Sequence, residues 1–140
     1  MPKDFTIGKA APQEALSDRF RHLMVGSGFQ EIFLPILCSV EDQTTQMRTP
    51  DADIVQISNP MSENYSAVRV SLLPGLLQVE SASRRAIYPH HIFEVGEVAV
   101  LSPEEDYGTR TEIHLGALEA SDEANLSGIQ SYLEVLAYYF

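Results

Sequence analysis

Histidine is the first side chain to consider for chemistry in this chain, because it binds metals and transfers protons. The chain has four, of which His90 and His91 are adjacent while His22 and His114 are isolated. None has the i, i+4 spacing that lets two histidines on one helix hold a zinc ion. The pattern therefore favours solvated or hydrogen-bonded histidines over a metal site.

Acidic residues and cysteine give no stronger signal. Residues 104–106 (Glu-Glu-Asp) lie beside proline and glycine, which is typical of a solvated turn. Asp51 and Asp53 could coordinate a cation, but the glycine and further oxygen ligands of a calcium loop are missing. The single cysteine, Cys38, is expected to be a small buried apolar side chain. We therefore predict no catalytic, cofactor-binding or metal-binding residue.

Arg69 is the one cation embedded between apolar residues, in Val68-Arg69-Val70. A guanidinium binds phosphate or carboxylate through two parallel hydrogen bonds, so Arg69 could clamp a ligand. It could instead be half of a buried or interfacial ion pair, with Glu94 as the candidate partner. No second basic group lies nearby to share a phosphate, so we favour the ion pair.

The segment 59–77, NPMSENYSAVRVSLLPGLL, has the most distinctive pattern in the chain. After an Asn-Pro turn it predicts a helix start, in which Ser71 can cap and Pro74 lies in the first turn, where its missing N–H costs little. Gly75 is unexpected, because glycine in a helix costs about 1 kcal/mol relative to alanine. This suggests close packing of the helix against another backbone, or inheritance within a family.

The composition predicts a soluble, acidic protein of one domain. The chain has 140 residues, 44% of them hydrophobic, and no run of about 18 apolar residues or N-terminal leader, so we expect a cytoplasmic location. Twenty acidic and nine basic residues give a formal net charge of −11, which disfavours direct contact with nucleic acid. Lysine occurs only as Lys3 and Lys9, and an acid-rich, lysine-poor composition resembles proteins of salt-loving organisms.

Hydrophobic periodicity and turn residues predict an α+β order. Residues 1–11 are expected to be a linker or tail and residues 12–140 one module. The expected elements are a helix from Pro12 that ends at Gly26 and Gly28, strands over 29–37 and 54–57, a helix from Ser71 to about Arg85, a hairpin of strands 91–101 and 112–118, and a final helix capped by Asp122 or Asn125. Pro35 argues for an edge strand or a bulge. Because the final helix ends on three aromatic residues, we expect a fragment that continues beyond residue 140; a helix docked by its own end is the alternative.

Two groups of motifs resemble known families. Gly28-Phe29-Gln30-Glu31-Ile32-x-x-Pro35-Ile36-Leu37, following an amphipathic helix, resembles the first motif of class II aminoacyl-tRNA synthetases, a helix–strand unit used for subunit pairing. The segments 59–77 and 92–97 are close to the β subunit of phenylalanyl-tRNA synthetases, of the archaeal type. The residues that carry this resemblance, which covers residues 4 to 140, are Asn59, Pro60, Arg69, Ser71, Pro74, Gly75, Phe93, Glu94 and Gly96.

The resemblance implies a class II fold, an antiparallel sheet flanked by helices, here truncated, in a module that has lost its active site. The second class II motif needs an arginine on a strand to hold the α-phosphate of ATP. At the corresponding place stands Phe93-Glu94. Because a carboxylate repels phosphate, we expect ATP binding to be abolished there. The third motif, a glycine-rich helix start with an arginine, is absent from the chain.

The resemblance also implies a heterotetramer of two α and two β subunits, in which α, with ATP and Mg²⁺, charges tRNA with phenylalanine. This chain is then a non-catalytic, cofactor-free module that pairs with α, while tRNA is bound by the complex. The candidate interface residues are Leu16, Phe20, Leu23, Phe29, Ile32 and Pro35. For each of them, packing within the module is the alternative. Two other functions stay open: a stand-alone synthetase-like paralogue that acts as a binding or regulatory protein, and a residual enzyme that binds ATP or phenylalanine.

Overall fold

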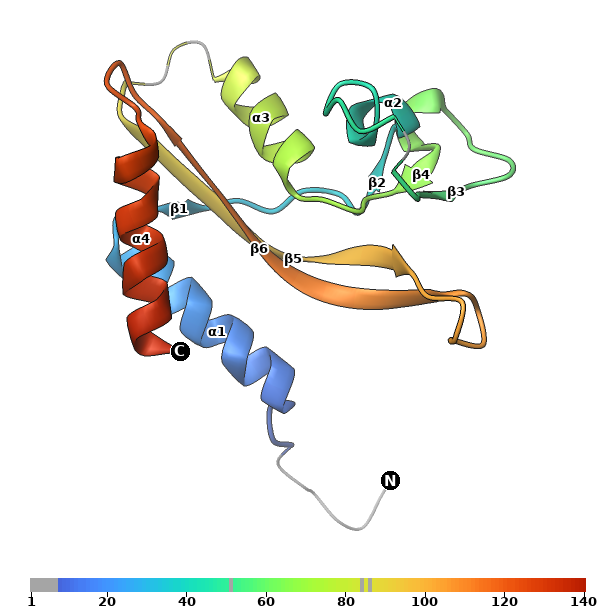
Figure 1. The fold of residues 1–140 in the computed structure, drawn as a ribbon, viewed down its shortest axis with the longest axis horizontal. Coiled ribbons are helices and arrows are strands. Elements are labelled where there is room, and N and C mark those ends of the chain that lie inside the picture. Colours follow the sequence, from blue (N-terminus) through green and yellow to red (C-terminus); the bar gives the residue numbers. More distant parts are fainter. Residues whose placement is uncertain (1–7, 51, 84, 86) are drawn as a thin grey trace, which may run out of the picture.

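The computed structural model describes residues 8–50, 52–83, 85 and 87–140, so most of the expected tail lies outside the described residues. It shows an α+β module built on one long hairpin (Figure 1). In chain order the elements are α1 (Pro12–Gly26), β1 (Gln30–Glu31), β2 (Leu37–Cys38), α2 (Val40–Gln43), β3 (Val55–Gln56), the 3-10 helix η1 (Glu63–Tyr65), β4 (Ala67–Val68), α3 (Leu73–Ala82), β5 (His90–Leu101), β6 (Thr109–Ala120) and α4 (Leu126–Tyr139).

The described strands form two small sheets. In the first, β5 and β6 pair as antiparallel strands of 12 residues each, and β1 adds to β5 in parallel. In the second, β4 lies between β2 and β3 and is antiparallel to both. The predicted hairpin is confirmed, and its strands are longer than expected. The parallel pairing of β1 was not predicted, because the direction of a strand depends on its partner, and the partner of Gln30 is Ile92, far along the chain.

Both faces of the hairpin are covered. Since successive side chains of a strand point to opposite faces, alternate residues of β5 enter two different environments. One face packs against α1 and α4, and its core consists of Met24, Phe29, Phe93 and Val95. On the other face a Cβ at Gly116 would lie 2.9 Å from the Cβ of Leu72, so α3 lies directly on the hairpin. Figure 1 shows α3 on one side of the hairpin and α1 with α4 on the other.

Helix α1 ends as the glycines predict. The backbone N–H of Gly28 donates to the carbonyl of Val25, and that of Phe29 donates to the carbonyl of Met24, both at 3.0 Å. This is the Schellman pattern, which needs a residue in the left-handed region, and Gly28 has φ of +88°. The turn delivers Phe29 into the core beside Met24. The termination of α1 therefore also begins the core.

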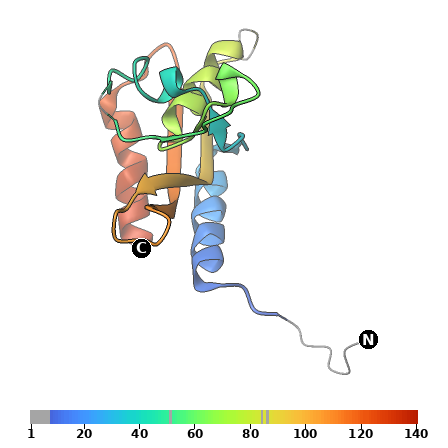
Figure 2. The same cartoon turned by 90° about the vertical axis from the view of Figure 1, so that its right-hand side faces the viewer.

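The aromatic end of α4 packs on α1, and Figure 2 shows the two helices side by side. The ring of Phe140 stacks on Phe20 with centroids 4.0 Å apart. Arg19 donates to the carbonyl of Tyr139 at 3.1 Å and lies over the Phe140 ring. A cation at a helix C-terminus offsets the partial negative charge there. The end of α4 therefore docks on α1, and this packing does not test the expectation that the chain is a fragment.

Two boundaries differ from the predictions, and one open alternative is decided. The single strand expected over residues 29–37 is wrong: β1 and β2 belong to different sheets, and Pro35 lies in the break between them. The helix expected to reach Arg85 ends at Ala82. Of the two caps proposed for the final helix, Asn125 is the one used, and its side chain accepts the N–H of Gly128 at 3.0 Å. Local periodicity did not reveal the change of partner at Pro35, since both pieces are equally apolar.

Candidate functional site

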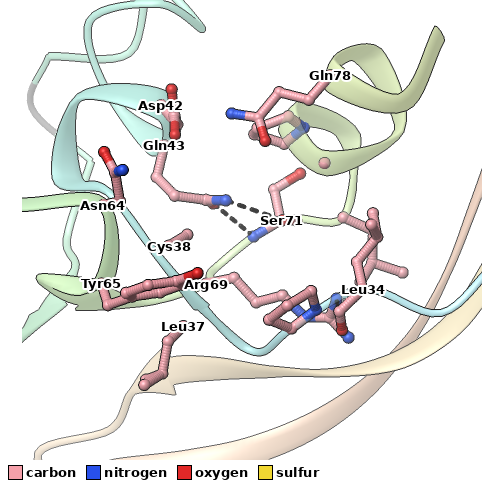
Figure 3. Close-up of a pocket in the computed structure, with 14 residues that line it drawn as sticks. Leu34, Leu37, Cys38, Asp42, Gln43, Asn64, Tyr65, Arg69, Ser71 and Gln78 are labelled. Carbon is pink, nitrogen blue, oxygen red and sulfur yellow. Dashed lines mark hydrogen bonds between the residues drawn. The ribbon is translucent and has the colours of Figure 1, made fainter. Parts of the chain in front are cut away.

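A pocket of about 480 Å³ lies between α2, η1 and the start of α3, within the size range of small-molecule sites. Figure 3 shows its polar side chains converging from these elements. They are Asp42, Gln43, Asn64, Tyr65, Arg69, Ser71 and Gln78. The apolar part of the wall includes Leu34, Leu72 and Pro74. This pocket and the charged pair beside it form the candidate site.

Arg69 and Glu94 make a buried ion pair, as the sequence predicted. Their side chains, 6% and 1% exposed, meet at 2.8 Å between an arginine terminal nitrogen and Glu94 Oε1. The Arg69 Nε also donates to the carbonyl of Glu97 at 2.8 Å, and another terminal nitrogen donates to the carbonyl of Leu34 at 3.3 Å. Three acceptors therefore hold the guanidinium across the β1–β2 connection and β5.

The pair explains why glycine stands at position 96. A Cβ built there would overlap an Arg69 terminal nitrogen and would lie 2.7 Å from Glu94 Oε1. Both side chains are buried, so neither can move out into solvent. The other carboxylate oxygen, Glu94 Oε2, has no hydrogen-bond partner among the described residues. The site is thus tightly built around the ion pair.

The electrostatic reasoning about Glu94 needs a correction. We expected its carboxylate to face, and repel, a phosphate. In the structure the Arg69 guanidinium neutralises it, and it is almost completely buried. Its cross-strand neighbour Gly116 is covered by Leu76 of α3 and by Leu72, the residue that caps this helix. Repulsion by Glu94 therefore no longer supports the expected lack of ATP binding at this strand, which stays a prediction.

Gln43 is a site residue that the sequence reasoning missed. It is 4% exposed, and its Oε1 accepts the N–H groups of Val70 and Ser71 at 3.2 and 3.0 Å. Its Nε2 donates to the carbonyl of Ser71 at 3.2 Å. A glutamine in a polar stretch gives no local signal, because its partners lie 27 and 28 residues away. Gln43 holds the chain in place just before α3.

The start of α3, within segment 59–77, agrees only partly with the prediction. Pro74 lies in the first turn of α3 and is buried. Ser71 is not the N-cap residue, which is Leu72, although the Ser71 hydroxyl accepts the N–H of Leu73 at 3.3 Å. A Cβ at Gly75 would lie 2.5 Å from Leu34 Cδ1, so the close neighbour is a side chain and not another backbone. Of the other resemblance residues, Phe93 is in the core, while Asn59 and Pro60 form the turn after β3.

The candidate interface residues lie in different environments. Phe29 is 3% exposed and belongs to the core, so the alternative of packing within the module holds for it. Phe20, Leu23 and Ile32 are partly buried, whereas Leu16 and Pro35 are exposed. Nearby, Phe33 is 89% exposed and Ile36 is 38% exposed. These two residues were not predicted, although the apolar run around Pro35 contains them.

Three of the histidines lie beside a glutamate: two are hydrogen-bonded to it, and the third lies slightly farther away. This agrees with the prediction of hydrogen-bonded or solvated histidines. His90 pairs with Glu80 at 3.0 Å, His114 with Glu112 at 3.1 Å, and His91 lies 3.7 Å from Glu119. The structure brings no three metal-ligating side chains together within the described residues, and Asp51 lies outside them. The described helices are all too short or too polar to cross a membrane.

Cys38 lines the pocket and is half-buried. Burial, assisted by the nearby Asp42 carboxylate, raises the pKa of the thiol to about 11. Because the thiolate is the nucleophilic form, this environment suppresses its reactivity. Cys38 is therefore a weak nucleophile, and it is half-buried where the sequence predicted a buried side chain.

Comparison with known proteins agrees with the motifs. Residues 1–139 match the family model described as "Phenylalanyl tRNA synthetase beta chain CLM domain". The phenylalanine–tRNA ligase beta subunit of Treponema pallidum is 41% identical to this chain, and the alignment covers 99% of this chain and 23% of that subunit. The beta subunit of Borrelia recurrentis is 42% identical, and its alignment covers 99% of this chain and 25% of that subunit. The chain thus spans about a quarter of these relatives. The archaeal type is not tested by these matches and stays a prediction.

A solved structure supports the fold. The pyrrolysyl tRNA synthetase PylSc of Desulfitobacterium hafniense aligns with a TM-score of 0.64 at 14% identity, over 88% of this chain and 43% of that one. At this identity the likeness concerns the fold alone. The class II synthetase-like α+β fold expected from the motifs is confirmed.

Proposed function

The chain belongs to the phenylalanyl-tRNA synthetase β chain family, through its CLM domain, and from this premise we propose that it is a non-catalytic structural module of phenylalanine–tRNA ligase. In this proposal it pairs with the catalytic α subunit, which charges tRNA with phenylalanine at the expense of ATP. The relatives of known name are β subunits of this ligase. Its role is thus in protein biosynthesis, as part of a complex.

The observation that carries the non-catalytic role is the buried pair of Arg69 and Glu94. A class II synthetase needs a free arginine on the strand where this chain has Glu94. Here the carboxylate takes up Arg69, the cation nearest to it, and Arg69 makes two further bonds to backbone carbonyls. A guanidinium engaged with a carboxylate and two carbonyls is held by the fold and is not free to clamp a substrate phosphate through two parallel hydrogen bonds. The second observation is the packing of Leu72 and Leu76 over the same hairpin face.

The surface around the β1–β2 connection supports the pairing role. Phe33 and Ile36 are exposed there, together with Leu16 on α1. The first two line a second pocket of about 480 Å³ with Glu14, Arg21 and Ile113. Exposed aromatic and aliphatic side chains beside a hollow, with charged groups at its rim, resemble the centre of a protein–protein interface. We propose that α contacts this surface.

Co-purification of the full-length β subunit with its α subunit tests this proposal. The variant Phe33→Asp should reduce recovery of α, because it places a charge in the centre of the proposed contact. The matched control is Tyr107→Asp, since Tyr107 is 93% exposed at the far end of the hairpin. Phe29→Asp is unsuitable, because Phe29 is a core residue. If wild-type β does not recover α, the scaffold role fails; if both variants behave like wild type, the interface lies elsewhere.

Four further features belong to the same proposal. We expect an assembly of two α and two β subunits, ATP and Mg²⁺ bound by α, and a cytoplasmic location. We also expect tRNA to be held by the complex and not by this acidic chain, whose net charge is −11.

A further inference from the structure

Several polar groups around the first pocket are not used by the fold. The side chains of Asp42, Asn64, Tyr65 and Gln78 line it, and none of them makes a hydrogen bond or an ion pair with another residue that the structure describes. Gln43 and Arg69, by contrast, are occupied by backbone groups and by Glu94. Figure 3 shows Asp42 and Gln78 facing each other at the top of the view, with Gln43 and Ser71 below them. Asn64, Tyr65 and Gln78 are exposed and Asp42 is half-buried, so all four side chains are accessible to a ligand in this pocket.

The lining contains one acidic side chain, Asp42, and one basic side chain, Arg69. Asp42 is its one uncompensated charge among the described residues, since Arg69 is neutralised by Glu94. The remaining free groups are neutral amides and hydroxyls, which supply carbonyl and hydroxyl oxygens as acceptors. The surrounding protein, at a net charge of −11, strengthens the attraction for cations. The pocket therefore suits a positively charged group with several N–H donors.

The first pocket continues into a smaller, partly apolar hollow. A second hollow of about 230 Å³ shares Asp42, Pro74 and Gln78 with the pocket and continues between α2 and α3. Its wall includes the apolar side chains of Met47 and Leu77. A carboxylate where a polar pocket meets a partly apolar groove fits a cation carried on an aliphatic stem, since the stem can rest on the apolar wall.

We propose that this site binds an alkylammonium or alkylguanidinium group, with Asp42 as its counter-ion and Gln78 as a hydrogen-bonding partner. Two sources present this chemistry: a free polyamine, and a lysine or arginine side chain of a partner protein. The proposal is independent of the pairing role, because these residues do not line the pocket beside Phe33.

Calorimetric titration of the full-length protein tests the proposal with two probes, spermidine and a short capped peptide with a single lysine. Asp42→Asn should weaken binding about tenfold or more, as expected when a hydrogen bond to a charged group is lost. Glu41→Gln is the matched control: it removes the same charge from the same helix, and Glu41 is exposed and does not line the pocket. It should change the affinity less than about twofold, as is typical of an exposed charge.

The outcomes are distinct. Tighter binding of spermidine than of the peptide supports the site and identifies a small-molecule source, whereas the reverse supports the site and identifies a partner side chain. Equal loss of affinity in Asp42→Asn and Glu41→Gln would show only general attraction to an acidic protein, and would overturn the proposal. Absence of binding by both probes would overturn it as well. Because the Asp42 carboxylate makes no bond to another described residue, Asp42→Asn should retain the wild-type melting temperature.

Discussion

Replacing Arg69 by methionine strips the buried Glu94 carboxylate of its counter-ion. Glu94 is 1% exposed, so water cannot take over the role of the guanidinium. Breaking a buried pair from one side costs about 3–5 kcal/mol, because an uncompensated charge is left in a medium of low polarity. Most small domains have a total stability of about 5–15 kcal/mol. Arg69→Met should therefore bring the chain close to unfolding.

The double variant Arg69→Met, Glu94→Met separates the charge from the lost hydrogen bonds. Both variants leave the carbonyls of Leu34 and Glu97 without the Arg69 donor, but the double variant has no buried carboxylate. It should therefore be more stable than Arg69→Met alone, by about 2 kcal/mol or more. Glu94→Gln should cost about 1–3 kcal/mol, since Arg69 keeps its two carbonyl acceptors and the amide oxygen can still accept.

Urea unfolding followed by circular dichroism measures these differences, with the slope checked for two-state behaviour. The decisive comparison is the single against the double variant. If Arg69→Met proved as stable as the double variant, then removing the carboxylate would have no effect. In that case the reasoning that the pair compensates a buried charge would be refuted.

Four further predictions follow from named features. Gly96→Ala should destabilise the chain, because its Cβ would overlap Arg69 and lie 2.7 Å from Glu94 Oε1, whereas Gly26→Ala, with no atom within 4 Å, should be tolerated; their urea midpoints decide this. Cys38 should alkylate slowly at pH 8, since burial raises its pKa from 9.0 to about 11 and lowers the thiolate fraction about 100-fold; unfolding the chain should restore the rate. The melting temperature should rise between low and molar KCl, because salt screens the repulsion of a net charge of −11; no rise would contradict the halophile-like reading of the composition. Calorimetry should detect no micromolar binding of ATP to this chain, and such binding would contradict the non-catalytic role.

Local chemistry allowed several parts of the fold to be predicted. Gly28 ends α1 because a left-handed residue is needed there, Pro74 begins α3 without losing a hydrogen bond, and Asn125 caps α4. The hairpin followed from two apolar runs around a turn. The pairing of Arg69 with Glu94 was also predicted, since a cation between valines needs a buried counter-charge. Each of these depends on a residue's own conformational or electrostatic requirement.

The pocket could not be predicted in the same way. Gln43, Asn64 and Gln78 come from three segments with no shared periodicity, and each is an ordinary surface residue when taken alone. The break at Pro35 was missed because an apolar run looks the same whether it pairs with one strand or two. The burial of Phe29 and the exposure of Phe33 could not be told apart in the sequence, because the two residues have the same side chain and differ only in whether the fold turns them toward the core.

The sequence by itself determined the family, the α+β class and the positions where backbone geometry demands glycine or proline, because these depend on residue type and short spacing. The tertiary structure decided between two sequence-based interpretations of Glu94, a partner of Arg69 and a charge that repels phosphate. In the sequence it stands where a catalytic arginine is expected, as a charge opposed to phosphate. Only when β5 lies beside the segment before α3 does Arg69 come within 2.8 Å of it. A carboxylate's effect depends on which charges surround it and how far it lies from water, and folding sets both.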